Sequence, residues 1–289
     1  MNWVPFVFID TVCCRLTVDA SKQVSELSDS WSEFGAEHHE KRREFVFSCT
    51  VDGKECSYYF LDSKNKTLYG LRACDLNLEF DRITSVKFAS NLMNHWGNPV
   101  SLDELRRDVL PIISSLATNC RWCYLDSEFS DRNRFFFNAF KNCSGFDEIS
   151  VKEQGQESRD FVTRQVELSN VHTLHLFEQG TSSWPEQQKL AETLETFVNS
   201  ARFHDLMFPG GLTNDFELFA LFLERALVGE LKPGARIWNQ KTFCEEGDRI
   251  SALHPECRED SKEIAWRISN SSSRITLKHV YGTLSMEMK

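Results

Sequence analysis

The sequence predicts an α/β protein in three successive parts: N-terminal helices, a small antiparallel β-meander, and an irregular leucine-rich-repeat-like βα array. Three changes in the spacing of apolar residues lead to this prediction. Apolar residues recur at helical spacing up to residue 44, form strand-like runs up to about residue 90, and then alternate between the two patterns from residue 101. With 289 residues, 41% of them hydrophobic, the chain can bury one or two cores.

Residues 1–44 are expected to form two short amphipathic helices joined by a turn around Thr17–Ser21. The first helix begins at Val4-Pro5, since a proline in the first turn lacks only an N–H group that would have no helical partner. Its apolar stripe consists of Phe8, Ile9, Val12, Cys13 and Leu16. The stripe of the second helix consists of Val24, Leu27, Trp31 and Phe34.

Residues 45–289 are expected to form a second domain, which begins with strands from Phe45 to about Ser90. Asp52-Gly53 separates two strand-like runs and predicts a hairpin turn. Further strand candidates are Thr67–Leu71 and Ile83–Phe88. We expect these strands to form a small antiparallel meander.

From Ser101 onward, helices alternate with short apolar strands, a pattern that favours parallel pairing. Ser101 and Glu104 form a capping box that begins the first helix, and Pro111 should kink this helix. A second capping box begins at Ser183. The strand centres are Leu125, Ile149, Leu174, Leu206 and Ile237.

The spacings between these strand centres are 24, 25, 32 and 31 residues. Leucine-rich repeats are about 20–29 residues long, so the spacing is compatible with a repeat array, although the leucine-rich consensus is absent. Closing strands are expected at Ile264–Ile268, Arg274–Val280 and Thr283–Met288.

The formal net charge of −10 argues against nucleic-acid binding, because phosphate contacts require a concentrated basic surface. The one basic cluster, Lys41-Arg42-Arg43, is flanked by Glu40 and Glu44. We expect this cluster to be a solvated helix end.

Export and membrane insertion are not indicated by the sequence. The apolar start Trp3–Ile9 has no preceding Lys or Arg and is too short for a secretory signal. No run approaches the roughly 20 apolar residues that span a bilayer. The 10 cysteines are dilute and are expected to be reduced, which predicts an intracellular protein, either cytoplasmic or nuclear.

No catalytic, cofactor-binding or metal-binding site is predicted, and we do not expect an enzyme. Glycine-rich phosphate loops are absent from the sequence. His38-His39-Glu40 lacks the i, i+4 spacing of a helical zinc site, so these residues are expected to be exposed to solvent. Cys120 and Cys123 have the spacing of a metal or redox pair, but a second pair is missing, so we expect buried, inert thiols.

One ungapped pattern near the N-terminus points to a family. The residues that carry it are Val4-Pro5, Val12-Cys13, Leu16, Leu27-Ser28 and Trp31. The pattern resembles the F-box, which begins Leu-Pro, continues with Ile-Leu and a later Leu in a helix, and ends Val-Ser-x-x-Trp. It is similar in particular to the divergent F-box-like family that is expanded in nematodes. The chain departs from the F-box at Val7, where an acidic residue is usual, and at Ser21-Lys22, where leucines are usual.

The resemblance implies that residues 1–44 are a helical F-box-like module that binds a Skp1-type adaptor, which connects to a cullin and a ubiquitin ligase. The remaining residues would then present a target protein for ubiquitination. An amphipathic helix docks in a partner groove through one apolar stripe. The expected partner-binding residues are Val4, Pro5, Phe8, Ile9, Val12 and Leu16. Trp31 is expected to pack the two helices together.

Two alternatives remain open. The N-terminal stripe could pack on the protein's own meander, and the chain would then be a protein-binding module with a decayed F-box and no ligase link. Alternatively, the chain could be an uncharacterised enzyme with a cleft at the C-terminal ends of the parallel strands. The loops that would converge there follow Leu125, Val151, Phe177 and Phe208.

Overall fold

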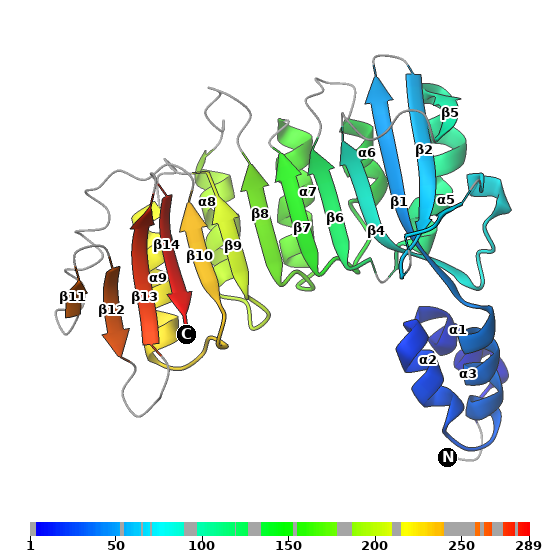
Figure 1. Ribbon diagram of the computed structural model, residues 1–289, viewed down its shortest axis with the longest axis horizontal. Coiled ribbons are helices and arrows are strands. Elements are labelled where there is room, and N and C mark those ends of the chain that lie inside the picture. The colour runs from blue at the N-terminus through cyan, green and yellow to red at the C-terminus, as the bar shows by residue number, and fades with distance from the viewer. Residues whose placement is uncertain are drawn as a thin grey trace. The chain divides into compact units, whose positions relative to one another are not determined.

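The computed structural model describes residues 4–289 apart from 53–54, 65, 70, 90–96, 119, 127–133, 153–154, 178–186, 210–214, 240–257, 261–262, 268–273 and 281–282. Three N-terminal helices are followed by a mixed β-sheet with interleaved helices, which confirms the predicted α/β class (Figure 1). The chain forms two compact units, Met1–Phe146 and Asp147–Lys289. The N-terminal helices therefore share a unit with the first strands.

The N-terminal segment contains three helices and not the two that the apolar spacing predicts. They are α1 (Phe6–Arg15), α2 (Val18–Ser25) and α3 (Ser30–Lys41). The side chain of Thr17 caps α2 by accepting a hydrogen bond from the amide of Ala20 (3.2 Å). Asp29, with a φ of 61°, interrupts the chain before α3. The apolar spacing stays helical across Asp29, so periodicity alone could not reveal the second break.

Helices α2 and α3 pack closely at Gly35, which is buried in α3. A Cβ atom at this position would lie 2.5 Å from the backbone nitrogen of Ser25 and 2.8 Å from the carbonyl carbon of Val24. At the same crossing, the hydroxyl of Ser32 donates a hydrogen bond to the carbonyl oxygen of Ser25 (2.8 Å). The absence of a side chain at position 35 therefore permits this approach of the two helices.

The sheet of the first unit has the strand order β6-β4-β1-β2-β3, with β5 beside β2. Its strands are β1 (Arg43–Asp52), β2 (Glu55–Asp62), β3 (Leu68–Tyr69), β4 (Asp81–Ala89), β5 (Asn98–Ser101) and β6 (Trp122–Asp126). β1 and β2 form the predicted antiparallel hairpin, in which Asp52 pairs with Glu55. Strand β5, which pairs antiparallel with β2, was not predicted.

The prediction of a wholly antiparallel meander is wrong, because β4 runs parallel to β1, with Phe47 beside Val86. Asp81 anchors the start of β4 in this position. Its carboxylate accepts hydrogen bonds from Nε and Nη2 of Arg43 at 2.7 and 2.6 Å. An apolar run predicts a strand but does not specify the neighbour or the direction of pairing, so the sequence pattern could not distinguish the two arrangements.

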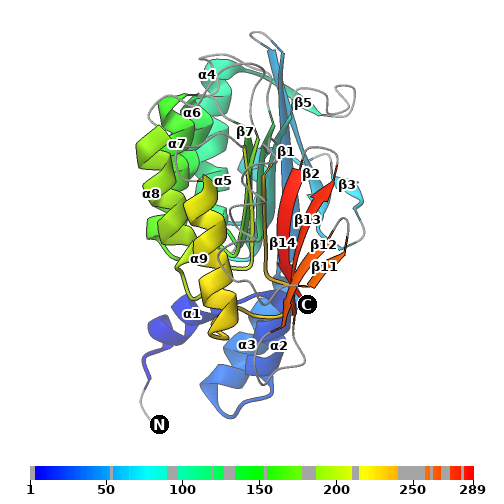
Figure 2. The ribbon, with the colours of Figure 1, turned by 90° about the vertical axis from the view of Figure 1, so that its left-hand side faces the viewer.

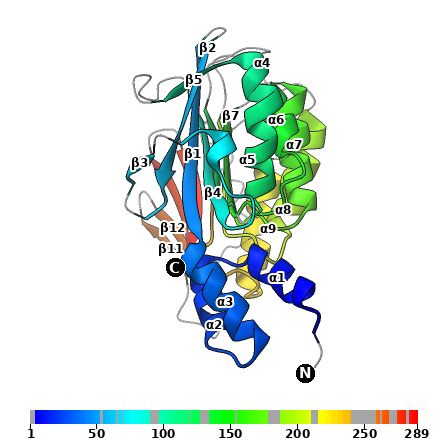
Figure 3. The same ribbon diagram turned by 90° about the vertical axis from the view of Figure 1, so that its right-hand side faces the viewer.

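Helices cover one face of this sheet, as Figure 3 shows for α5 (Leu110–Leu116) and α6 (Arg134–Phe140). The strand residues on the buried face include Phe47, which is fully buried. Its ring centroid lies 5.6–5.9 Å from those of Tyr58, Phe60 and Phe88. These aromatic contacts make the centre of the first core.

The helix that begins after Ser101 has one half of the predicted capping box, and a π-helical turn precedes Pro111. The hydroxyl of Ser101 accepts a hydrogen bond from the amide of Glu104 (3.2 Å), whereas the Glu104 carboxylate lies near Arg72 (3.7 Å). After α4 (Leu102–Glu104), the turn η2 (Leu105–Val109) is π-helical and directly precedes α5, which contains Pro111. The wide turn accommodates the proline ring, which would clash with a carbonyl group of a regular helix.

The sheet of the second unit has the strand order β7-β8-β9-β10-β14-β13-β12-β11. Its first strands, which pair in parallel, are β7 (Glu148–Lys152), β8 (Thr173–Phe177), β9 (Asp205–Phe208) and β10 (Arg236–Asn239). The others, all antiparallel, are β11 (Arg258–Asp260), β12 (Glu263–Arg267), β13 (Arg274–Val280) and β14 (Thr283–Met288).

Three helices lie on one face of this second sheet (Figure 2). They are α7 (Gln156–Glu167), α8 (Gln187–Val198) and α9 (Asp215–Leu227). The predicted strand centres are confirmed, since each lies in one of the strands β6 to β10. The expected closing strands correspond to β12, β13 and β14, whereas β11 was not predicted. The capping box at Ser183 lies outside the described residues.

Candidate functional site

The first turn of α1 exposes three consecutive apolar side chains. Phe6, Val7 and Phe8, here called the apolar first turn, are 64%, 78% and 55% exposed. In the part of the chain that the structure describes, they are three of the six exposed large hydrophobic residues. Exposure is therefore concentrated at one place, as is typical of a surface that binds another molecule.

The six predicted partner-binding residues divide between the surface and the interior. Pro5 and Phe8 are exposed, whereas Ile9 is only 2% exposed. The half-buried residues are Val4, Val12 and Leu16. Ile9 therefore supports the fold of the helical segment and is not available at its surface. Phe6 and Val7 were missed because we selected only the apolar positions that recur at helical spacing.

Aromatic pairs join α1 to α3 beneath the exposed turn. The ring centroids of Phe6 and Phe34 are 6.0 Å apart. Those of Phe8 and Trp31 are 6.4 Å apart, with the rings nearly perpendicular at 88°. The role predicted for Trp31, packing helices together, is confirmed. The edges of these rings hold the first turn in place while most of its surface stays exposed.

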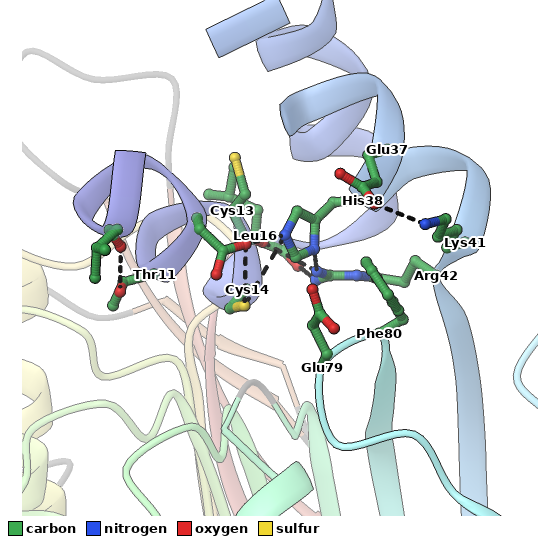
Figure 4. A network of polar contacts seen from close by, with 12 residues as sticks. Thr11, Cys13, Cys14, Leu16, Glu37, His38, Lys41, Arg42, Glu79 and Phe80 are labelled. Atoms are coloured by element: carbon green, nitrogen blue, oxygen red, sulfur yellow. Dashed lines mark hydrogen bonds and ion pairs between the residues drawn. The ribbon is translucent and has the colours of Figure 1, made fainter. Parts of the chain in front are cut away.

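Two buried arginines cap the last carbonyl groups of α1. Arg42, which directly follows α3, donates a hydrogen bond from Nη2 to the carbonyl oxygen of Cys13 (3.0 Å) and another from Nη1 to that of Leu16 (Figure 4). Arg82, in β4, donates a hydrogen bond from Nε to the carbonyl oxygen of Cys14 (2.7 Å). The carbonyl end of a helix carries partial negative charge, so both cations stabilise it.

The two guanidinium groups lie close enough to affect each other. Burial lowers the pKa of Arg42, and the charge of Arg82 lowers it further. Burial also lowers the pKa of Arg82. The prediction that Lys41-Arg42-Arg43 is a solvated helix end is therefore wrong for Arg42, which is 7% exposed. Local charge spacing could not reveal that Arg42 folds back onto a helix that lies earlier in the chain.

His38 is buried at 1% exposure, so the prediction that this residue is exposed to solvent is also wrong. Its Nδ1 lies 2.9 Å from Nη2 of Arg42 (Figure 4). Its Nε2 lies 2.8 Å from Oδ1 of Asp10. A guanidinium group can only donate, so Nδ1 accepts and the ring proton is on Nε2, which donates to Asp10. His38 thus links the end of α3 to α1.

Asp10, Cys14 and His38 also form a group with the composition of a metal site. Sγ of Cys14 lies 3.9 Å from Nε2 of His38 and 4.0 Å from Oδ1 of Asp10. A metal would need the lone pair of Nε2, but the contact from Arg42 to Nδ1 places a proton there. Burial and the charge of Asp10 raise the pKa of the Cys14 thiol, which disfavours the thiolate. The contacts therefore fit a structural link better than a metal site.

Cys120 and Cys123 are both fully buried and have free thiols, as predicted. Burial raises the pKa of the Cys123 thiol well above its usual value, and electrostatic interaction with the neighbouring Cys120 raises it further. A thiol of this kind stays protonated and is a poor nucleophile or metal ligand. The pair is therefore part of the first core.

A polar cluster lies among three strands of the second unit, with the buried carboxylate of Asp205 at its centre. Asp205 accepts hydrogen bonds from His175 Nε2 (3.0 Å), Arg236 Nε (2.7 Å) and Trp238 Nε1 (3.3 Å). Burial raises the pKa of Asp205, but the hydrogen bonds from His175 and Arg236 outweigh it, so the net pKa is lowered. Every donor is directed at one carboxylate, which is the geometry of a structural cross-link between strands.

The cleft of the enzyme alternative lies largely outside the described residues, because the segments 127–133, 153–154, 178–186 and 210–214 follow its predicted strands. Among the described helices, none is long and apolar enough to cross a membrane. No protein-family model matches the chain, and no curated protein sequence matches it.

Proposed function

We propose that this chain is an F-box-like substrate-recognition adaptor, whose N-terminal helices bind a Skp1-type adaptor and whose sheet-containing part presents a target protein for ubiquitination. The observation that carries this proposal is the apolar first turn, with Phe6, Val7 and Phe8 exposed directly after Val4-Pro5. These residues fall within the pattern from Val4 to Trp31 that resembles the F-box. Full burial of an exposed Val or Phe side chain contributes about 1.5–3 kcal/mol, and these side chains, at 55–78% exposure, would contribute a corresponding share of that.

The contact surface in this proposal is narrower than the stripe predicted from sequence. It consists of Pro5, Phe8 and the neighbouring Phe6 and Val7, whereas Ile9 holds α1 in its own unit. The capping of α1 by Arg42 and Arg82 supports the proposal, because it fixes the helix end opposite the exposed turn. A fixed helix loses less conformational entropy when it binds.

The finer description of the sheet-containing part, an irregular leucine-rich-repeat-like βα array, belongs to the same proposal. Helices α7, α8 and α9 share one face of the second sheet, and no described helix of this unit covers the other face (Figure 2). In β8, Thr173, His175 and Phe177 are half-buried, whereas the alternate residues Leu174 and Leu176 are fully buried. This alternation supports a target-binding role for the half-buried face.

A pull-down with a Skp1-type protein tests the proposal, with Val7→Lys as the variant and Val228→Lys as its matched control. Val7 lies in the first turn of α1 and Val228 directly follows α9, and the two side chains are similarly exposed, at 78% and 72%. Because the F-box usually has an acidic residue where Val7 stands, lysine introduces the opposite charge as well as a polar group. A cation near the start of a helix costs about 0.3–1 kcal/mol, so urea unfolding checks that Val7→Lys is folded. We expect Val7→Lys to abolish capture and Val228→Lys to retain it.

Equal capture of the two variants would refute the proposed contact. Failure of the intact, folded chain to capture any Skp1-type protein would instead favour a protein-binding module with a decayed F-box and no ligase link.

A further inference from the structure

A basic pocket lies where the start of α2 meets strands β1 and β4. Its volume is about 300 Å³. Four cationic side chains line it, namely Lys64, Lys66, Arg82 and Arg121. Polar groups from Thr17, Ser63, Thr84 and Ser85 complete much of the wall. The whole pocket belongs to the first unit.

Three of these cations have no acidic partner among the described residues. Lys66 donates to the carbonyl oxygen of Ser63 (2.8 Å), and no carboxylate in the described ranges lies within ion-pair distance of Lys64, Lys66 or Arg121. Such a group of unpaired cations is notable in a chain whose formal net charge is −10.

The fourth cation, Arg82, is 6% exposed, and its guanidinium donates only to carbonyl oxygens. These acceptors belong to Cys14, Leu78, Glu79 and Asp81. Its N–H groups are therefore occupied, and among the described residues no carboxylate forms an ion pair with it, although the nearby charges of Asp81 and Glu79 act on it. The field of this buried cation reaches into the pocket and favours a negative ligand there.

The acidic residues that line the pocket do not balance these charges. They are Asp19 and Glu44, two carboxylates against four cations. Glu44 is already engaged, because its Oε1 accepts a hydrogen bond from the amide of Val18 at the start of α2 (3.3 Å). The carboxylate of Glu44 therefore already serves the start of α2. The excess positive charge of the pocket comes from the lysine and arginine side chains.

A fifth cation lies beside the pocket on the same strand face, since Lys87 follows Ser85 by two positions in β4. Burial lowers the pKa of Lys87, and the charge of Lys66 lowers it further. The Lys87 ammonium lies 4.6 Å from the ring centroid of Trp122 and has no carboxylate partner among the described residues. Repulsion between these lysines would be relieved by an anion bound between them.

We propose that this pocket binds a phosphate monoester. A phosphate group carries a charge of about −1.5 to −2 at neutral pH and offers three acceptor oxygens, which matches the excess of two cations over carboxylates. Lys64, Lys66 and Arg121 are exposed at the rim and can donate hydrogen bonds, while Arg82 contributes charge from below. The remaining volume admits the group that carries the phosphate. This site is separate from the apolar first turn, so it does not depend on adaptor binding.

Isothermal titration calorimetry at constant ionic strength tests the site. It measures the affinity of the full chain for O-phosphoserine. We expect the double variant Lys64→Gln with Lys66→Gln to weaken binding by at least tenfold. The matched control is Lys232→Gln, which removes an exposed lysine in the other unit and should leave binding unchanged. Both lysines of the double variant are exposed, so the fold should be retained, which circular dichroism checks.

A phosphoserine peptide and its unphosphorylated form distinguish the two sources of the phosphate. Tighter binding of the phosphopeptide than of O-phosphoserine would assign a protein ligand, and equal binding would assign a small phosphate ester. Each of these results supports the pocket. Absence of O-phosphoserine binding, or an equal affinity in the double variant and the wild-type chain, would overturn the proposal.

Discussion

Arg82 in β4 donates a hydrogen bond to the carbonyl oxygen of Cys14 in α1, at a distance of 2.7 Å and across 68 positions of the sequence. Arg42 caps two other carbonyl groups at the same helix end. The N-terminal helices are thus attached to the first sheet through charge and hydrogen bonds as well as through apolar packing. This attachment orients the apolar first turn of α1 and predicts which substitutions would release it.

Replacing Arg82 by lysine should destabilise the first unit by about 1.5–3 kcal/mol. Lysine keeps the positive charge but cannot reproduce the planar fork that serves the carbonyl groups of Cys14 and Glu79. Urea unfolding measures the change. Arg107→Lys is the control, since Arg107 is exposed and its side chain forms hydrogen bonds only with the adjacent Asp108 among the described residues. It should leave the unfolding midpoint unchanged. Equal midpoints for Arg82→Lys and the wild-type chain would show that the capping contributes little.

Replacing Gly35 by alanine should destabilise the N-terminal helices. In an ordinary helix this substitution stabilises by roughly 0.5–1 kcal/mol, because alanine has the higher helix propensity. Here the added Cβ would lie 2.5 Å from the backbone nitrogen of Ser25, so α2 and α3 must separate. We expect a lower melting temperature, measured by circular dichroism.

The neighbouring Ala36 provides the control for Gly35, since it is exposed in the same helix. Ala36→Gly changes only the helix propensity and should lower the free energy of unfolding by about 1 kcal/mol. A rise in melting temperature for Gly35→Ala would mean that the two helices do not cross as closely as described.

The sequence predicted the strands well because each buried strand carries its own apolar run. Leu174 and Leu206, chosen as strand centres, are fully buried and lie side by side in β8 and β9. The pairing of β4 with β1 was not predictable in this way, because it depends on a contact between Arg43 and Asp81 that are far apart in sequence. Periodicity reports burial but does not identify the neighbouring strand.

The candidate sites show the same division between local and distant contacts. The exposed position of Phe8 agrees with a stripe that starts at Val4-Pro5, which is a local pattern. The burial of His38 and Arg42 depends on the end of α1, more than 20 positions earlier in the sequence, and no local spacing encodes it. The basic pocket likewise assembles lysines and arginines from separate segments.

The second unit should lose stability in acid, because the contribution of the Asp205 carboxylate is lost there. Its net pKa is lowered in the folded chain, despite burial, by hydrogen bonds from His175 and Arg236. A carboxyl whose folded pKa lies below its unfolded value of about 3.9 contributes stability above that value and loses it as the pH falls through the folded pKa. Asp205→Asn should therefore cost about 1–3 kcal/mol near pH 7.

The cost of Asp205→Asn should begin to shrink as the pH falls below about 4, where the carboxyl of the unfolded chain takes up a proton, and should level off below the folded pKa, where the folded carboxyl is neutral as well. Urea unfolding at a series of pH values measures this convergence. Asp147→Asn is the control, because Asp147 pairs with His172 at 3.4 Å while about half exposed, and its effect should be small at every pH. A difference between Asp205→Asn and the wild-type chain that stays constant down to low pH would contradict the proposed role of the carboxylate.

Substitutions at Ile9 and Val7 should distinguish the buried side of α1 from its exposed surface. Ile9→Ala removes a side chain that is 2% exposed and should destabilise the chain by about 2–4 kcal/mol, as measured by urea unfolding. At a temperature where this variant remains folded, it should still capture a Skp1-type protein, because the apolar first turn is intact. Val7→Lys should show the reverse, with unfolding close to that of the wild-type chain and no capture, since Val7 is 78% exposed. If Ile9→Ala alone lost capture while folded, the contact surface would instead include the stripe that contains Ile9, and α1 would have to rotate or detach from α3 to bind.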